Sequence, residues 1–157
     1  MKELYAYRQR MLTNWQEIVP ALEREVTSIP AERWHAIPPH GGWTCHQVLA
    51  HLRDIESLVI APSIRSLLAG RDGALPPCPE DSAWLQGYRA DEAPEEIFRA
   101  YVAIRSEETG LLMQLDAPPW NASARHPQFG VRTLQWWVEA SLQHARRHLS
   151  LLQRQAR

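Results

Sequence analysis

Residues 142–152, LQHARRHLSLL, decide the fold, because they place His144 and His148 four residues apart among leucines. On an α-helix four residues advance about 400°, so the two imidazoles differ by about 40° in azimuth and can reach one atom. Both continue an inward-facing stripe made of Leu134, Trp137, Val138 and Ser141. A polar ring facing the interior costs free energy unless it is hydrogen-bonded or ligated. The stretch therefore predicts a buried helix whose histidines have a partner.

The rest of the chain predicts three more long helices. Apolar residues recur every three or four positions over residues 2–27, 44–68 and 94–115, and the last helix extends from about residue 133 almost to the end. Thr44 is a good N-cap for the second helix, and Pro94 suits the first turn of the third. Four amphipathic helices and no evident strand predict an all-α four-helix bundle, and 157 residues fit one domain spanning 1–157. The long connections are rich in Pro and Trp, so we expect them to be ordered caps over one end of the bundle.

Composition excludes several classes of protein. The formal net charge is −1 and the arginines are scattered, so there is no basic patch for nucleic acid. No apolar stretch approaches the roughly 20 residues that span a bilayer, and the N-terminal residues lack the apolar region of a signal peptide. We therefore expect a cytoplasmic protein that binds neither nucleic acid nor membrane. Cys45 and Cys78 lack CxxC spacing, so we expect both thiols to be reduced.

A third histidine points to a metal site. His51 lies in VLAHLRDIE on the second helix, at a spacing from Val48 and Ile55 that also faces the interior. If the second and fourth helices pack with these faces together, three neutral imidazoles can surround a divalent cation at about 2.0–2.1 Å for zinc. The remaining coordination positions would be open to a ligand.

Two segments carry a family resemblance. GGWTCHQVLAHLRDIE (residues 41–56) and HPQFGVRTLQWWVEASLQHARRHLSLL (residues 126–152) resemble the DinB-like (YfiT-like) bacterial four-helix-bundle metalloproteins. The order of the motifs matches, and the likeness covers nearly the whole chain. In that family three histidines ligate the metal, and at the matching positions here they are His51, His144 and His148.

The resemblance implies a function. It implies a metal-dependent transferase or isomerase that acts on a small molecule with a low-molecular-weight thiol such as bacillithiol, mycothiol or glutathione. It also implies a homodimer. Three imidazoles suit zinc, nickel, iron or cobalt, and we expect zinc or nickel, with iron as the alternative.

Two other functions stay open. A dication held by three neutral ligands lowers the pKa of a bound thiol or of a bound water, so a metal-dependent hydrolase is one alternative. A non-catalytic, metal-stabilised dimeric protein that serves in binding or in the stress response is the other. A deep, open pocket beside the metal would favour an enzyme.

Several further residues are candidates for the site. Asp54, three residues after His51, is the catalytic candidate, because it can orient a ligand or accept a proton. The alternative is a surface carboxylate paired with an arginine. Gln47, one turn before His51, can reach the open coordination positions. Arg105, at a position that is often basic in the family, could hold an anionic substrate or form a surface salt bridge.

The remaining histidines have other expected roles, and two rival metal motifs fail. We expect surface or capping roles for His35, His40 and His46, and a place for His126 at the edge of the pocket. A ferritin-like di-iron site needs two Glu-x-x-His pairs, whereas the only such spacing is Glu32 to His35. A zinc protease of the HExxH type needs Glu after the first histidine, where Ala145 stands.

Overall fold

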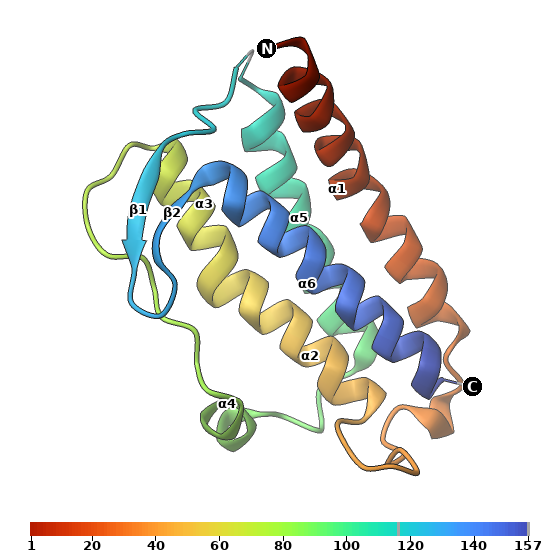
Figure 1. The fold of residues 1–157 in the computed structure, drawn as a ribbon. Helices are drawn as coiled ribbons and strands as arrows, with labels where there is room; N and C mark the ends of the chain where they lie inside the picture. The colour runs from red at the N-terminus through yellow and green to blue at the C-terminus, as the bar shows by residue number, and fades with distance from the viewer. Residues whose placement is uncertain (116, 157) are drawn as a thin grey trace.

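The computed structural model describes residues 1–115 and 117–156, in which four long helical segments run side by side (Figure 1). They are α1 (Lys2–Ser28), the continuous segment α2 (Cys45–Ile55), η2 (Glu56–Ile60) and α3 (Ala61–Leu68), then α5 (Pro94–Met113) and α6 (Leu134–Gln155). The predicted four-helix bundle is confirmed, and the helix ends agree within about two residues, as expected for such boundaries. Capping explains the starts of α2 and α6, because the Thr44 and Thr133 hydroxyls accept bonds from the N–H groups of Gln47 and Trp136.

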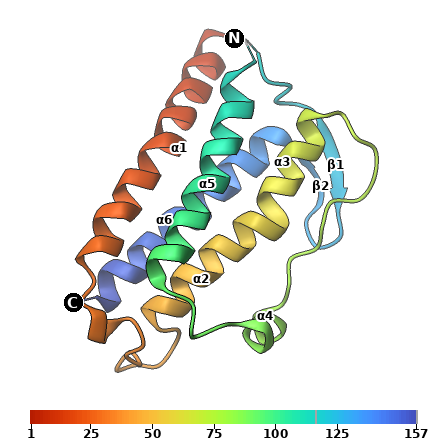
Figure 2. The same cartoon turned by 180° about the vertical axis from the view of Figure 1, so that it is seen from behind.

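The bundle combines parallel and antiparallel neighbours. The chain colours of Figures 1 and 2 show that α1 and α6 run in one direction while α2–α3 and α5 run in the other. The helix α6 packs against both α1 and α2, and α5 packs against the same two helices. Because α3 and α5 are successive but parallel, the chain must return along the whole bundle between them. This return explains the long connection over residues 69–93.

The connections contain structure that the sequence did not predict. A short 3-10 turn, η1 (Ala31–Arg33), follows α1, and the short helix α4 (Asp81–Gly87) lies within the return segment. The expected absence of strands was wrong, because β1 (Ser123–His126) and β2 (Gly130–Thr133) form an antiparallel hairpin before α6. Gly130, at φ 72°, has the left-handed conformation that a three-residue hairpin loop needs. The return segment and hairpin lie along one side of the bundle rather than over one end (Figure 1).

Hydrogen bonds join the hairpin to the return segment. The Leu75 N–H donates to the Arg125 carbonyl at 2.9 Å. The side-chain amide of Gln128 forms two hydrogen bonds with the backbone of Cys78. Its nitrogen donates to the Cys78 carbonyl at 2.7 Å, and its oxygen accepts from the Cys78 N–H at 3.0 Å. Two loops that are distant in sequence therefore form one ordered wall beside α2 and α6.

The core extends along the bundle in two groups of buried side chains. One centres on Leu22, Leu49 and Tyr101, and the other on Trp15, Ile64 and Trp137. Within the part of the chain that the structure describes, no helix is both long enough and apolar enough to cross a bilayer.

Arg105 is buried in this core, which corrects both roles predicted for it. Its side chain is 1% exposed, lies 3.3 Å from the Trp15 ring centroid and donates to the Trp15 carbonyl at 2.8 Å. The guanidinium also contacts Glu56 at 3.3 Å and donates to the Ser141 hydroxyl at 2.6 Å. Arg105 is thus the positive partner of a buried carboxylate, neither a surface salt bridge nor a substrate contact.

Two glutamates meet in this buried network. Glu56 begins the π-helical turn η2, and its carboxylate accepts from the Ser141 hydroxyl at 2.9 Å. Glu108 is also fully buried, and burial followed by the neighbouring Glu56 raises the pKa of its carboxyl well above the usual value. Burial and the neighbouring carboxylate therefore favour the protonated form of Glu108, while Arg105 is the positive partner of Glu56.

Candidate metal centre

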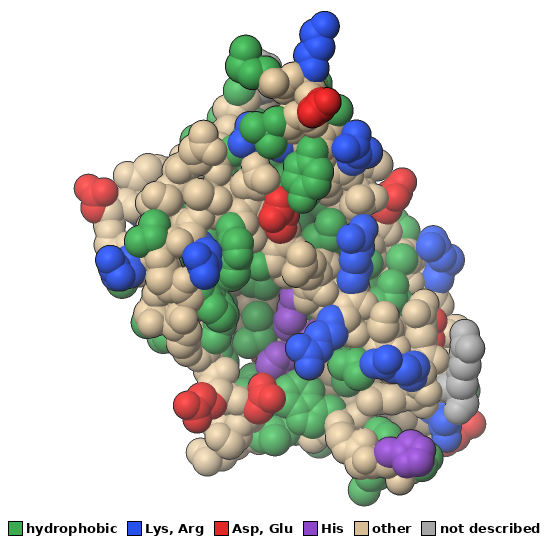
Figure 3. Space-filling model, viewed as in Figure 1, with side chains coloured by type: hydrophobic (Ala, Val, Ile, Leu, Met, Phe, Trp, Pro, Cys, Tyr) green, Lys and Arg blue, Asp and Glu red, His purple; other side chains and the backbone are tan. Residues whose placement is uncertain are grey.

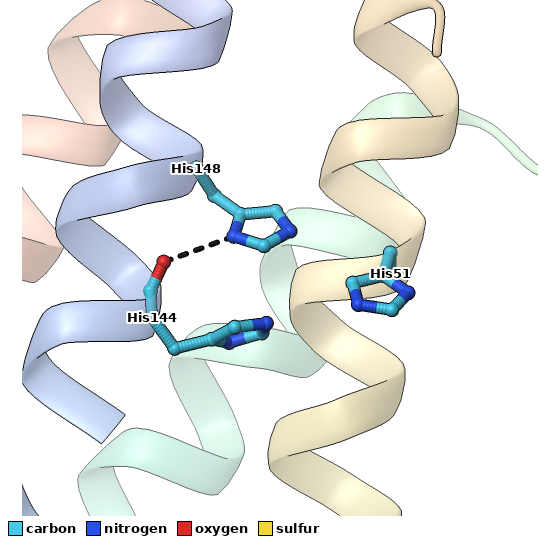
Figure 4. A group of neighbouring side chains, drawn as sticks. All are labelled: His51, His144 and His148. Atoms are coloured by element: carbon cyan, nitrogen blue, oxygen red, sulfur yellow. Dashed lines mark hydrogen bonds between the residues drawn. The ribbon is translucent and has the colours of Figure 1, made fainter. Parts of the chain in front are cut away.

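The three predicted histidines meet between α2 and α6. Each offers a ring nitrogen, and these nitrogens all lie within 4.8 Å of one another. The ring centroids of His144 and His148 are 4.2 Å apart, and that of His51 lies 5.6 Å and 5.3 Å from them. Figure 4 shows the three imidazoles converging from the two helices. The structure brings together the residues that the sequence predicted as ligands.

Hydrogen bonding prepares these imidazoles for a metal. The Nδ1 of His148 lies 2.9 Å from the carbonyl oxygen of His144, and since a carbonyl only accepts, Nδ1 carries the proton (Figure 4). The lone pair of His148 is therefore on Nε2. The Nδ1 atoms of His51 and His144 are buried and have no hydrogen-bond partner among the described residues. Such orphaned nitrogens are costly unless they are ligated.

The site keeps the imidazoles neutral. Burial is the main effect, and it lowers the pKa of His144 to about 2 and that of His148 to about 4. Burial also lowers the pKa of His51. The neighbouring imidazoles and the Arg147 guanidinium lower the pKa of His144 further. Neutral imidazole is the form that binds a divalent cation, so the donors fit such an ion at neutral pH.

Two tryptophan rings pack against the imidazole of His51. The ring centroids of Trp43 and Trp84 lie 4.6 Å and 5.0 Å from that of His51, and the two indoles are 4.9 Å apart. The Trp84 indole N–H donates to Asp54 at 2.9 Å. His51 is thus packed between aromatic rings, one of which is fixed by a carboxylate.

Asp54 lies behind these rings, outside the three-histidine cluster. One carboxylate oxygen accepts from Trp84 and the other from the Arg53 guanidinium at 2.6 Å, while Arg53 also forms a bidentate pair with Glu92. Both oxygens therefore have partners. The catalytic role predicted for Asp54 stays a prediction, and the observed contacts connect it to His51 through the Trp84 indole.

The other candidates on the second helix have structural roles. Gln47 completes a capping box, and its side-chain oxygen accepts from the Thr44 N–H at 2.9 Å, so this oxygen is occupied away from the clustered histidines. The expected surface position of His46 was wrong, because the ring is fully buried. Its Nε2 donates to the Glu92 carbonyl at 2.7 Å and its Nδ1 accepts from the Tyr88 hydroxyl. His46 therefore fastens the return segment to α2.

The remaining histidines and both thiols lie outside the cluster. His35 and His40 are exposed, as predicted, and His35 stacks on His46. His126 is buried in β1, where its Nδ1 accepts from the Gln128 and Phe129 N–H groups and closes the hairpin loop. Cys45 is buried and Cys78 partly buried, and the two form no disulfide with each other.

A pocket of about 300 Å³ opens beside the histidines. Its lining includes His51 and His144 together with residues from η2, the return segment, the hairpin and α6. Figure 3 shows histidine atoms at the bottom of a hollow bordered by hydrophobic side chains. The pocket gives a small molecule access to the predicted ligands.

The sequence did not predict the residues that complete this pocket. Cys78 and Asp81 come from the return segment and Phe129 from the hairpin loop, neither of which has a periodic pattern that could place them. Trp136 lines the pocket beside Trp137, which the sequence assigned to the core face of α6. Proline and tryptophan enrichment was the one signal that these connections are ordered.

The chain is similar to known proteins over most of its length. YfiT from Bacillus subtilis, a probable metal-dependent hydrolase with an unusual four-helix bundle topology, superposes with a TM-score of 0.72 at 20% sequence identity, covering 93% of this chain and 85% of that one. A mutant of mycothiol-dependent maleylpyruvate isomerase superposes with a TM-score of 0.73 at 10% identity, covering 90% of this chain and 59% of that one. At these identities the two likenesses show a shared fold.

No curated protein matches the chain at a significant level. A sequence model of the DinB superfamily, however, matches residues 6–152, which include all three clustered histidines. With this match over nearly its whole length, the chain belongs to the DinB superfamily.

Proposed function

We propose that His51, His144 and His148 hold one divalent cation, and that the protein uses it to activate a low-molecular-weight thiol for transfer to, or isomerisation of, a small electrophilic molecule. The observation that carries the proposal is the convergence of three neutral imidazoles, two of which have buried nitrogens without a partner. Zinc or nickel suits such a donor set best, with iron as the alternative. A cation bound there supplies Lewis acidity, which lowers the pKa of a thiol or water in its open positions.

The chain's own residues orient and shelter the site. The His144 carbonyl fixes the His148 ring, and Trp43 and Trp84 pack on His51, so the three donors are held in place before anything binds. The apolar walls of the pocket exclude water from the reacting molecules. An open pocket that reaches two of the three ligands supports an enzyme over a non-catalytic, metal-stabilised bundle.

A metal-dependent hydrolase is the second candidate. Asp81 lines the pocket together with His51 and His144, and a carboxylate there is placed to accept a proton from water. The similar structures include both a probable hydrolase and a thiol-dependent isomerase, so they support either reaction equally.

The test begins with metal content, measured by plasma mass spectrometry on untagged protein. We expect about one ion per chain in the wild type, its loss in His51→Ala and His148→Ala, and full retention in the control His40→Ala, which changes an exposed histidine. Wild-type protein that contains no metal and cannot be reconstituted would overturn the proposal.

The second step separates the two reactions. Metal-loaded protein is incubated with an electrophile, either 1-chloro-2,4-dinitrobenzene or an aryl ester, in the presence and absence of bacillithiol, mycothiol or glutathione. Turnover that requires both metal and thiol would support the transferase or isomerase, whereas ester cleavage without thiol would support the hydrolase.

A further inference from the structure

The pocket beside the histidines is built from four separate parts of the chain. The helical segment η2 and the end of α2 form one wall, α6 forms the opposite wall, and the return segment and hairpin loop close the remaining side. Its volume of about 300 Å³ is at the lower end of the size range of small-molecule sites. A phenyl group or a branched alkyl chain fits a space of this size.

The walls are mainly apolar. Ile55, Val59 and Ile60 line one side, while Phe129, Trp136 and Trp137 present aromatic rings from the other. The Phe129 ring centroid lies 5.4 Å from that of Trp136 and 6.2 Å from that of Trp137, so the three rings form a continuous surface. Such a surface stabilises an apolar group by removing it from water.

The charged side chain that lines the pocket is an exposed carboxylate. Asp81 belongs to the lining, and no lysine or arginine does among the residues that the structure describes. Arg147, which acts on the same histidines, is exposed on α6 and is not part of this lining. In the metal-free protein, a carboxylate or phosphate against these walls would lose its hydration without gaining a cationic partner, and it would be repelled by Asp81.

We infer that the walls of the pocket hold an uncharged aromatic or branched aliphatic group, and that Asp81 disfavours an anionic group placed against them. The inference rests on the proposed function in one respect, namely that the occupant of this pocket is the molecule presented to the metal centre. The selectivity is attributed to the side chains that line the pocket, so it can be tested on the full chain without metal.

The test uses two ligands of the same shape, neutral 4-ethylbenzamide and anionic 4-ethylbenzoate. Each is titrated into the ¹⁵N-labelled full chain after removal of metal with a chelator, because a bound cation would itself attract the benzoate. Indole N–H signals report on the site, and Trp136→Phe and Trp137→Phe assign the two that line the pocket. We expect the benzamide to shift these two signals and to bind at least about tenfold more tightly than the benzoate.

Matched variants test the two walls. Phe129→Ala should weaken benzamide binding about fivefold, while Val131→Ala, which changes a 52% exposed residue of the same hairpin, should not. Asp81→Asn should strengthen benzoate binding about threefold and leave the benzamide unchanged, whereas Glu80→Gln, at the preceding exposed position, should change neither.

Either of two results would overturn the inference. One is benzoate binding as tight as that of the benzamide in the wild type, and the other is benzamide binding that leaves the Trp136 and Trp137 signals unmoved. Metal content is measured on separate samples, so the proposed function can fail while the pocket still discriminates, and the pocket can fail to discriminate in a protein that binds metal.

Discussion

The Nδ1 of His148 donates a hydrogen bond to the backbone carbonyl of His144, the residue one helical turn earlier, at 2.9 Å. The backbone carbonyl of His144 thus fixes the tautomer of His148, a role that a carboxylate often has at metal sites. The bond uses a carbonyl of α6 itself, so it needs no partner from another segment of the chain. Because burial in the folded chain lowers the pKa of both imidazoles, the pH dependence of folding should depend on them.

Acid should destabilise the metal-free protein through the buried histidines. Their pKa is lowered from 6.5 to about 2 in His144 and about 4 in His148, so the unfolded chain binds protons that the folded chain does not. The contribution of these histidines to the free energy of unfolding is complete above pH 6.5, and it is lost as pH falls toward their pKa values in the folded chain. Each group should contribute up to about 1.4 kcal/mol per pH unit in that window.

Urea denaturation between pH 7.5 and 5 measures this slope. In His144→Gln and His148→Gln each slope should be smaller by the contribution of one group, while the control His40→Gln should keep the wild-type slope because that residue is exposed. Identical slopes in all four proteins would mean that the cluster is charged in the folded state.

Glu108 should give the opposite pH dependence. Burial and the neighbouring Glu56 raise the pKa of Glu108 well above 4.5, so the folded chain keeps a proton that the unfolded chain releases. Its contribution is complete below pH 4.5 and is lost as pH rises toward the folded pKa, at up to about 1.4 kcal/mol per pH unit. Glu108→Gln keeps the shape of the side chain and removes its charge, so it should be more stable than the wild type at pH 8 and equal to it near pH 4.

A neighbouring glutamate gives the control for this prediction. Glu107 pairs with Arg65 at the surface, so Glu107→Gln should follow the wild type at every pH. Thermal melting across pH 4 to 8 shows the difference directly. Equal stability of Glu108→Gln and the wild type at pH 8 would place Glu108 in its charged form.

The periodic parts of the sequence predicted both the bundle and the convergence of the three histidines. His51, His144 and His148 belong to helical stripes whose inward direction depends only on spacing, and Thr44 and Thr133 start their helices through local hydrogen bonds. Such information lies within a few residues along the chain. Three histidines on two packed helices could therefore be brought together by reasoning from the sequence.

The features that the sequence did not predict depend on contacts between segments that are distant along the chain. Arg105 has the sequence context of a surface charge, and it is buried because Trp15, Glu56 and Ser141 approach it from three other segments of the chain. The hairpin strands have only four residues each, too few for a clear alternating pattern. Asp81 enters the pocket because hydrogen bonds fasten the return segment to the hairpin, which no local pattern encodes.

Removing Arg105 should destabilise the fold strongly. Arg105→Ala leaves Glu56 buried without its positive partner, so we expect a loss of about 3–5 kcal/mol in the free energy of unfolding. Arg105→Lys should recover only part of it, because an ammonium cannot bond Glu56, Ser141 and the Trp15 carbonyl with the same planar geometry. The control Arg99→Ala breaks an exposed pair with Glu96 and should cost less than about 1 kcal/mol. A stable Arg105→Ala protein would contradict the structural role.

Asp54 and Trp84 should act on the metal site as one unit. Asp54 is linked to His51 through the Trp84 indole, and its charge also acts on the imidazole, so Asp54→Asn and Trp84→Phe should each weaken metal binding, by up to about tenfold. The double variant should be little weaker than Trp84→Phe alone, because once the indole N–H is gone the carboxylate acts on the ring only through its charge. Competition with a chromogenic zinc chelator measures the three affinities. Additive losses would instead mean that Asp54 acts on the metal site directly, as the catalytic role predicted from its spacing requires.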